Sequence, residues 1–137
     1  MNTTTRYLCR LLGPYCLIAA AAMATHRDAT LQTITALVHD APLVFFAGVI
    51  TVLGGLAWIL VHNRWSGGGH TLLITVLGWI TLLKGLLFLF LPPADAPHFY
   101  LDTLHYPQWF YGYAGLSALI GLYLCFGGFG SRAEPAR

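Results

Sequence analysis

Charged residues are scarce in this chain of 137 residues, where they make up 9% of the sequence, and Lys84 is its only lysine. Soluble domains carry about 25% charged residues. The basic residues are scattered, and no cluster of the kind that follows a phosphate backbone is present, so nucleic acid is not an expected partner. Hydrophobic residues make up 57% of the chain. A soluble chain this short has too little interior to bury them, so the lipid bilayer is the expected solvent.

Cysteine is also scarce, and none of the three cysteines belongs to a Cys-x-x-Cys pair. Cys9, Cys16 and Cys125 lie in apolar segments, which favours small buried residues over a disulfide or a metal site. The chain holds no recognisable catalytic constellation and no cofactor motif. We therefore expect a non-enzymatic protein without a cofactor.

Apolar segments long enough to cross a hydrocarbon core, or nearly so, occur four times, since a helix needs about 20 such residues. Their runs are continuous rather than alternating, and prolines stand near their ends, which favours helices over strands. The sequence predicts an all-α membrane protein with one integral membrane domain covering residues 1–137. The four predicted transmembrane helices cover residues 8–24, 42–61, 71–91 and 108–126.

An internal repeat is suggested by a shift of about 65 positions, which places Leu12-Gly13 on Leu77-Gly78 and Pro42 on Pro107. The repeat predicts two similar helical hairpins, residues 9–61 and 74–127. A second interpretation of the first segment stays open, because Arg6 and Arg10 precede an apolar run that ends in an A-x-A sequence, as in a cleaved signal peptide.

The distribution of basic residues predicts the orientation in the membrane. The N-terminus, the 62–70 loop and the C-terminal tail hold five arginines, whereas the 25–41 and 92–106 loops hold one. Those five arginines are Arg6, Arg10, Arg64, Arg132 and Arg137. Because basic loops stay on the cytoplasmic side, we expect a multi-pass protein of the bacterial cytoplasmic (inner) membrane with both termini in the cytoplasm.

Small residues recur at helical spacings on each apolar segment. In lipid, such residues allow the close backbone approach that holds helices together. The predicted packing positions are Gly13, Ala20, Gly48, Gly55, Gly85 and Gly121. A glycine-lined pore is the weaker alternative.

Lys84 stands inside an apolar stretch, TVLGWITLLKGLLFLFLPP at residues 75–93, where an ammonium costs about 3 kcal/mol on insertion scales. It lies about 140° around the helix from Thr71, away from the small-residue stripe. Three interpretations stay open. Lys84 extends outward to headgroups or Asp95, pairs with a polar group of a partner subunit, or lines a polar cavity with Tyr111 or Tyr113.

Histidines and aspartates gather in the loops opposite the predicted cytoplasmic side. His98, Asp102 and His105 are the candidate metal ligands there, because their spacing would align them on one helix face. No compact metal signature is present, and a solvated rim is the favoured interpretation.

A motif joins the second and third predicted helices: HNRW at residues 62–65 followed by TVLGWITLLKG at 75–85. It resembles a group of small bacterial and archaeal four-helix membrane proteins with an HNxW…TxxGWxxxxKG pattern. The resemblance implies that the first helix is retained, and it supplies no mechanism; the glycine-rich loop after Trp65 departs from the group. The positions it marks for testing are His62, Asn63, Trp65, Thr75, Gly78, Trp79 and Lys84.

Two functions of different classes follow. The favoured one is an accessory or assembly subunit that packs against a membrane protein partner or forms a homo-oligomer. The alternative is a small transporter or channel that uses Lys84 and the interface between the two hairpins. A metal-dependent membrane enzyme ranks third.

Overall fold

Helices form nearly the whole of the computed structural model, which describes residues 2–92 and 94–130. The elements are α1 (Thr3–Thr25), α2 (Arg27–Val38), α3 (Ala41–Val61), α4 (Gly69–Phe90), the π-helical η1 (His98–Thr103) and α5 (Phe110–Phe129). Four of them, α1, α3, α4 and α5, are long and apolar enough to cross a membrane. No strand occurs within the described ranges. The predicted all-α, multi-pass membrane architecture is confirmed.

The helix ends differ from the predicted ones by a few residues. The largest difference is at α1, which begins at Thr3 rather than at residue 8, because the Asn2 side chain accepts a hydrogen bond from the Thr4 N–H (2.8 Å) and caps it. This helix also continues through Pro14, although proline was expected only at helix ends. Membrane helices tolerate such a proline where neighbouring groups compensate for the lost backbone bond.

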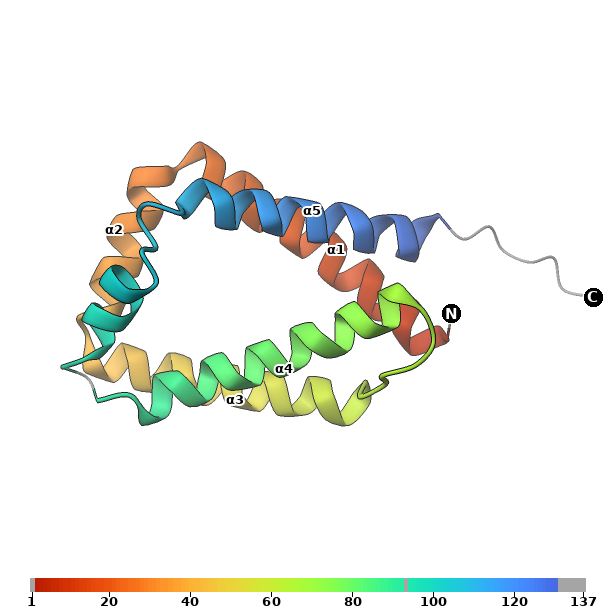
Figure 1. Cartoon of the computed structure of the whole chain (residues 1–137), viewed down its shortest axis with the longest axis horizontal. Helices are drawn as coiled ribbons and strands as arrows, with labels where there is room; N and C mark the ends of the chain where they lie inside the picture. The colour runs from red at the N-terminus through yellow and green to blue at the C-terminus, as the bar shows by residue number, and fades with distance from the viewer. Residues whose placement is uncertain (1, 93, 131–137) are drawn as a thin grey trace, which may run out of the picture.

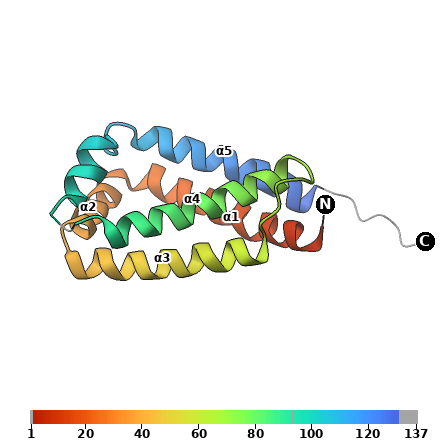
Figure 2. The ribbon, with the colours of Figure 1, turned by 60° about the horizontal axis from the view of Figure 1, so that its bottom comes forward.

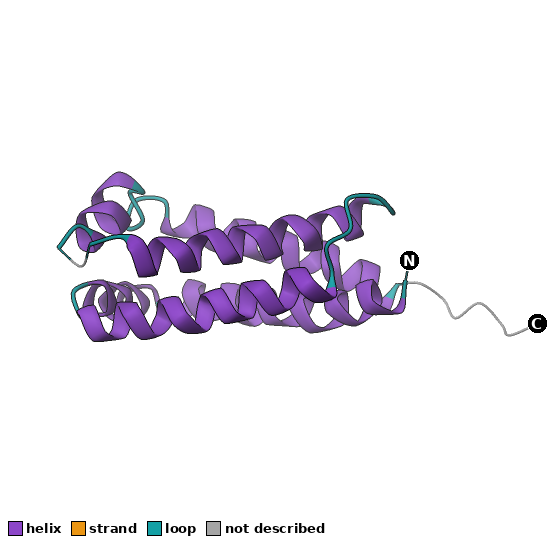
Figure 3. Cartoon of the chain, turned by 90° about the horizontal axis from the view of Figure 1, so that it is seen from below, coloured by secondary structure: helices purple, strands orange, loops and turns teal. Residues whose placement is uncertain are grey.

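Two further helices lie in segments that the sequence predicted as loops. α2 has twelve residues and η1 has six, so neither contains an apolar run long enough to stand out. Both lie at the end of the molecule away from the N-terminus (Figure 1). Figure 3 shows the loops gathered at the two ends of the bundle, with the α3–α4 connection opposite α2 and η1.

The four long helices form two close pairs, α1 with α5 and α3 with α4 (Figures 1 and 2). Backbone contact at glycine brings each pair together. A Cβ atom added at Gly13 would lie 2.9 Å from the Cys125 nitrogen, and one at Gly85 would lie 2.7 Å from the Val52 nitrogen. The other predicted packing positions also lie in these interfaces: Ala20 is buried, and Gly48, Gly55 and Gly121 contact the facing helix.

The two pairs converge near the N-terminus and diverge toward α2 (Figure 1). At the convergent end, the fully buried residues Cys9, Ile74 and Leu124 form a common core. Residues 9–61 contribute α1 and α3, which belong to different pairs, and residues 74–127 likewise contribute α4 and α5. The extensive helix contacts therefore lie between the two predicted hairpins rather than within them.

The ends that carry the predicted cytoplasmic arginines lie together. Arg6 and Arg10 on α1 and Arg64 in the α3–α4 connection all belong to the convergent end. Arg132 and Arg137 lie outside the described residues. The divergent end, with α2 and η1, corresponds to the side that the arginine distribution assigns to the exterior.

Candidate functional site

The motif residues around the α3–α4 connection fix that connection to α4. The Thr75 hydroxyl donates to the Arg64 carbonyl (2.7 Å) and accepts from the Arg64 N–H (3.2 Å). One turn further along α4, the Trp79 Nε1–H donates to the Asn63 side-chain oxygen (3.4 Å). Two side chains of α4 thus hold two consecutive residues of the connection.

The remaining motif residues near this end also serve the pairing of α3 with α4. A Cβ atom at Gly78 would lie 3.1 Å from Cδ1 of Trp58, so glycine makes room for the indole ring. His62 ends α3, with its backbone N–H bonded to the Trp58 carbonyl and only 1% of its surface exposed. Trp65 is exposed, as expected for an aromatic side chain at the membrane interface.

Lys84 takes no part in these contacts. It lies six residues before the end of α4 at Phe90, about 9 Å along the helix axis, near the divergent end. Among the described residues it has no hydrogen-bond partner, and no carboxylate oxygen lies within 4.0 Å of its ammonium. Pairing with Asp95, which the sequence left open, is therefore not observed. Lys84 is the one charged motif residue on α4, and packing does not account for it.

A cavity of about 310 Å³ lies beside Lys84, enclosed by α2, α3, α4 and the segment around η1. The wall includes three aromatic rings, several aliphatic side chains, and the hydroxyl groups of one threonine and two tyrosines. The lining residues are Ile34, Leu37, Val38, Ala47, Thr51, Lys84, Phe88, Tyr100 and Tyr106. Lys84 is itself an exposed residue, so the cavity is open to its surroundings on that side.

The cavity lies between the two predicted repeat units. Five lining residues, from Ile34 to Thr51, belong to 9–61, whereas Lys84, Phe88, Tyr100 and Tyr106 belong to 74–127. The sequence named Tyr111 and Tyr113 as partners of Lys84 in such a cavity, and this is corrected by the structure. The tyrosines that line it lie in η1 and just after it, because these residues fold back over the end of α4.

Phe88 connects Lys84 to the aromatic wall. The Lys84 ammonium lies 5.7 Å from the centroid of the Phe88 ring, within cation–π distance. The Tyr100 ring stacks on the same Phe88 ring at 4.9 Å between centroids. The Tyr100 hydroxyl is buried and has no hydrogen-bond partner in the described structure. The Lys84 ammonium and the Tyr100 phenol therefore both contact one aromatic ring, and neither has a hydrogen-bond partner among the described residues.

The other hydroxyl groups of the cavity differ in their availability. The Thr51 hydroxyl donates to the Ala47 carbonyl (2.6 Å), which uses its only hydrogen. Burial raises the pKa of Tyr100 above its ordinary value, so its hydroxyl stays protonated and can donate. Burial also raises the pKa of Tyr106, with a smaller contribution from nearby Tyr113.

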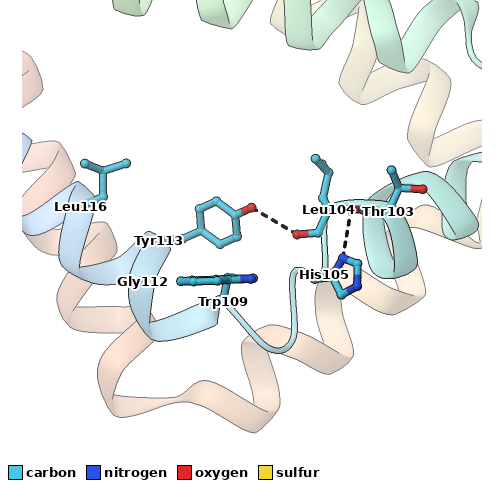
Figure 4. A pocket seen from close by; sticks show the side chains of 7 residues that line it. All are labelled: Thr103, Leu104, His105, Trp109, Gly112, Tyr113 and Leu116. Carbon is cyan, nitrogen blue, oxygen red and sulfur yellow. Dashed lines mark hydrogen bonds between the residues drawn. The ribbon is translucent and has the colours of Figure 1, made fainter.

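A second, more open cavity of about 490 Å³ is lined by residues between Thr103 and Leu116, among them Trp109 and Tyr113 (Figure 4). Tyr113 lines it and stacks on Tyr106, with ring centroids 5.2 Å apart. The Tyr113 hydroxyl donates to the Leu104 carbonyl (3.3 Å), and Trp109 lies beside Gly112 (Figure 4). Tyr106, which lines the cavity beside Lys84, thus stacks on a residue that lines the second cavity.

The candidate metal ligands are not brought together. Within residues 2–92 and 94–130, no group of three or more His, Cys, Asp or Glu side chains is placed to hold a metal ion. His98 and Asp102 are exposed on η1, and His105 follows it with Nδ1 3.1 Å from the Thr103 carbonyl (Figure 4). A six-residue π-helix winds more widely than the α-helix that the predicted alignment assumed.

No protein-family profile, curated protein or solved structure matches the chain. The function is therefore inferred from the geometry of the Lys84 cavity.

Proposed function

We propose that the protein is a small, non-enzymatic membrane transporter of the carrier type, which binds its substrate beside Lys84. The observation that supports this is an ammonium without a partner, facing a cavity between the two predicted repeat units. Intramembrane charges are costly and commonly mark substrate or ion pathways. Substrate sites at the interface between internal repeats are frequent among transporters.

A carrier accounts for the shape of the bundle better than a channel does. The cavity lies at the divergent end, whereas Cys9, Ile74 and Leu124 close the convergent end with no exposed surface. A continuous pore would need polar walls from one side of the membrane to the other. In the orientation given by the arginines, the described form is an outward-facing one in the bacterial inner membrane.

Flux measurements on purified protein in liposomes test this function. Vesicles that contain the protein and are loaded with an unlabelled organic acid should take up more of the same radiolabelled acid than protein-containing vesicles without internal acid. Lys84→Met should abolish the excess, and Lys84→Arg should retain part of it because the positive charge remains. Leu83→Met is the matched control, since Leu83 is exposed on the same helix and does not line the cavity. Equal uptake by the wild type and Lys84→Met would refute the carrier.

An accessory or assembly subunit is the second candidate. The observation in its favour is the open cavity of about 490 Å³ beside Tyr113 and Leu116, which a helix of a partner protein or of a second copy would cover. Extraction of the tagged protein in mild detergent, followed by native mass measurement, tests it. A membrane protein bound in a fixed ratio would support the subunit, and a lone monomer would exclude it.

A further inference from the structure

We propose that the Lys84 cavity binds a hydrophobic monocarboxylate, an acid with one negative charge and a compact apolar body. This inference rests on the proposed role of the cavity as a ligand site. Three features of the cavity support it: the single positive charge in the lining, the two hydrogen-bond donors without partners, and the apolar side chains of the remaining wall.

The charge of the cavity matches a single negative charge. Lys84 is the only cationic residue in its lining. The cation nearest in sequence to the α2 wall, Arg27, is paired with Asp28 (3.2 Å) and lies over the rings of Phe110 and Tyr111. A phosphate dianion is usually held by arginine forks or by several backbone N–H groups. The helical lining residues from Ile34 to Phe88 lie within helices, where backbone N–H groups are already bonded.

The free hydrogen-bond donors match a carboxylate. An ionised carboxylate accepts hydrogen bonds at two oxygens and donates none. Lys84 supplies an ammonium without a partner, and Tyr100 supplies a buried hydroxyl without a partner. The Lys84 ammonium and the Tyr100 ring both lie against the ring of Phe88, and both residues line the cavity. In the proposed complex, one carboxylate beside Phe88 accepts hydrogen bonds from both residues.

The rest of the wall requires an apolar body. Ile34, Leu37 and Val38 of α2 supply an aliphatic side, and Phe88 and the two tyrosine rings supply an aromatic side. A volume of about 310 Å³ is at the small end of ligand pockets, which favours a compact acid. A hydrophilic acid would leave its own polar groups unpaired against these side chains.

Such an acid can come from two sources, the aqueous phase or the bilayer. We use 3-phenylpropionate as the probe for a free aromatic acid and decanoate as the probe for a fatty acid. The controls are 3-phenylpropanol, which lacks the charge, and 2-phenylethyl phosphate, which carries a larger charge on a similar body. The full chain is placed in nanodiscs of zwitterionic phosphatidylcholine, so that no anionic lipid competes.

Calorimetric titration should show that at least one acid binds. The alcohol should bind about 10- to 100-fold more weakly, as expected for loss of a charge-assisted hydrogen bond. The phosphate should also bind more weakly, because its second charge would be buried without a cationic partner. Lys84→Met should weaken binding of the acid by a similar factor, and Lys84→Arg should keep most of the wild-type affinity. Tyr100→Phe should also weaken binding of the acid, by about 10- to 100-fold, because a hydroxyl that donates to an ionised carboxylate forms a charge-assisted hydrogen bond. Tyr7→Phe, an exposed tyrosine of α1 outside the cavity, should have no effect.

The outcomes separate this inference from the carrier proposal. Tighter binding of the phosphate, or no binding of either acid to protein that keeps its helical circular dichroism, overturns the monocarboxylate. Binding of an acid that depends on Lys84 and Tyr100, without flux in liposomes, supports the monocarboxylate and refutes the carrier. Preference for decanoate assigns the ligand to the bilayer, and preference for 3-phenylpropionate assigns it to the aqueous phase.

Discussion

The adjacent glycines of α3, Gly54 and Gly55, should respond in opposite ways to the same substitution. A Cβ atom at Gly55 would lie 2.7 Å from both the nitrogen and the Cα of Leu82 on α4. A Cβ atom at Gly54 would meet nothing within 4 Å. Alanine at Gly55 therefore collides with the backbone of the partner helix, whereas alanine at Gly54 faces lipid.

The size of the effect follows from the distance that must be recovered. Ordinary contact begins at 3.4 Å, so relief of the collision separates α3 from α4 by about 0.7 Å (3.4 − 2.7). Overpacking of this kind costs about 1–3 kcal/mol, a change of about 5- to 150-fold in the unfolding equilibrium. Gly54→Ala should be neutral or stabilising by up to about 1 kcal/mol, because alanine is the better helix former.

Reversible unfolding in mixed micelles of dodecyl maltoside and dodecyl sulfate, followed by circular dichroism, measures both changes. Gly55→Ala should unfold at a lower fraction of dodecyl sulfate than the wild type, and Gly54→Ala should not. Equal destabilisation by the two substitutions, or none by Gly55→Ala, would refute the close contact of α3 with α4 at this point.

Two further predictions concern the motif and the cavity. Thr75→Val should destabilise the protein by about 1–3 kcal/mol and speed amide exchange at Arg64, because the backbone N–H and carbonyl of Arg64 lose their partner. Thr75→Ser keeps the hydroxyl and should leave exchange unchanged; equal exchange in both variants would contradict the role of Thr75. Burial raises the pKa of Tyr100 and Tyr106 in the folded state, so their contribution to stability is present below pH 10, the ordinary tyrosine pKa being about 10, and is lost as pH rises through the folded-state values. Unfolding midpoints measured from pH 8 to 11 should fall at the alkaline end, and the fall should shrink in Tyr100→Phe with Tyr106→Phe; an identical fall in that double variant would show that other groups cause it.

The long helices could be predicted because their apolar runs are continuous, and a single chain in lipid has few alternatives to helices. Their partners could not. The glycines of α1 and α5 predict close approach to some helix, but Gly13 carries no information that its partner is Gly121. α2 and η1 were missed because short helices at a membrane surface do not need an apolar run.

For Lys84, likewise, some features could be predicted from the sequence and others could not. Its cost in lipid and its position off the small-residue stripe were evident from the sequence. The identity of its neighbours was not, because Tyr100 and Tyr106 reach the cavity only through the fold of η1 over the end of α4. No periodic pattern in the sequence of residues 92–109 predicts that η1 lies over the end of α4.

The helix pairing and the position of Lys84 together distinguish residues that pack the helices from the residue that is expected to bind a ligand. The predicted repeat relates α1 to α4 and α3 to α5. Under this relation the close pair α1–α5 corresponds to the pair α4–α3, which is the other close pair observed. The shift of 65 positions that relates the units places Lys84 on Ala19. Packing glycines such as Gly13 and Gly78 recur under the shift, whereas the charge does not. A residue that departs from the predicted repeat without contributing to helix packing is the position where function is expected, and Lys84→Met should therefore change binding far more than it changes stability.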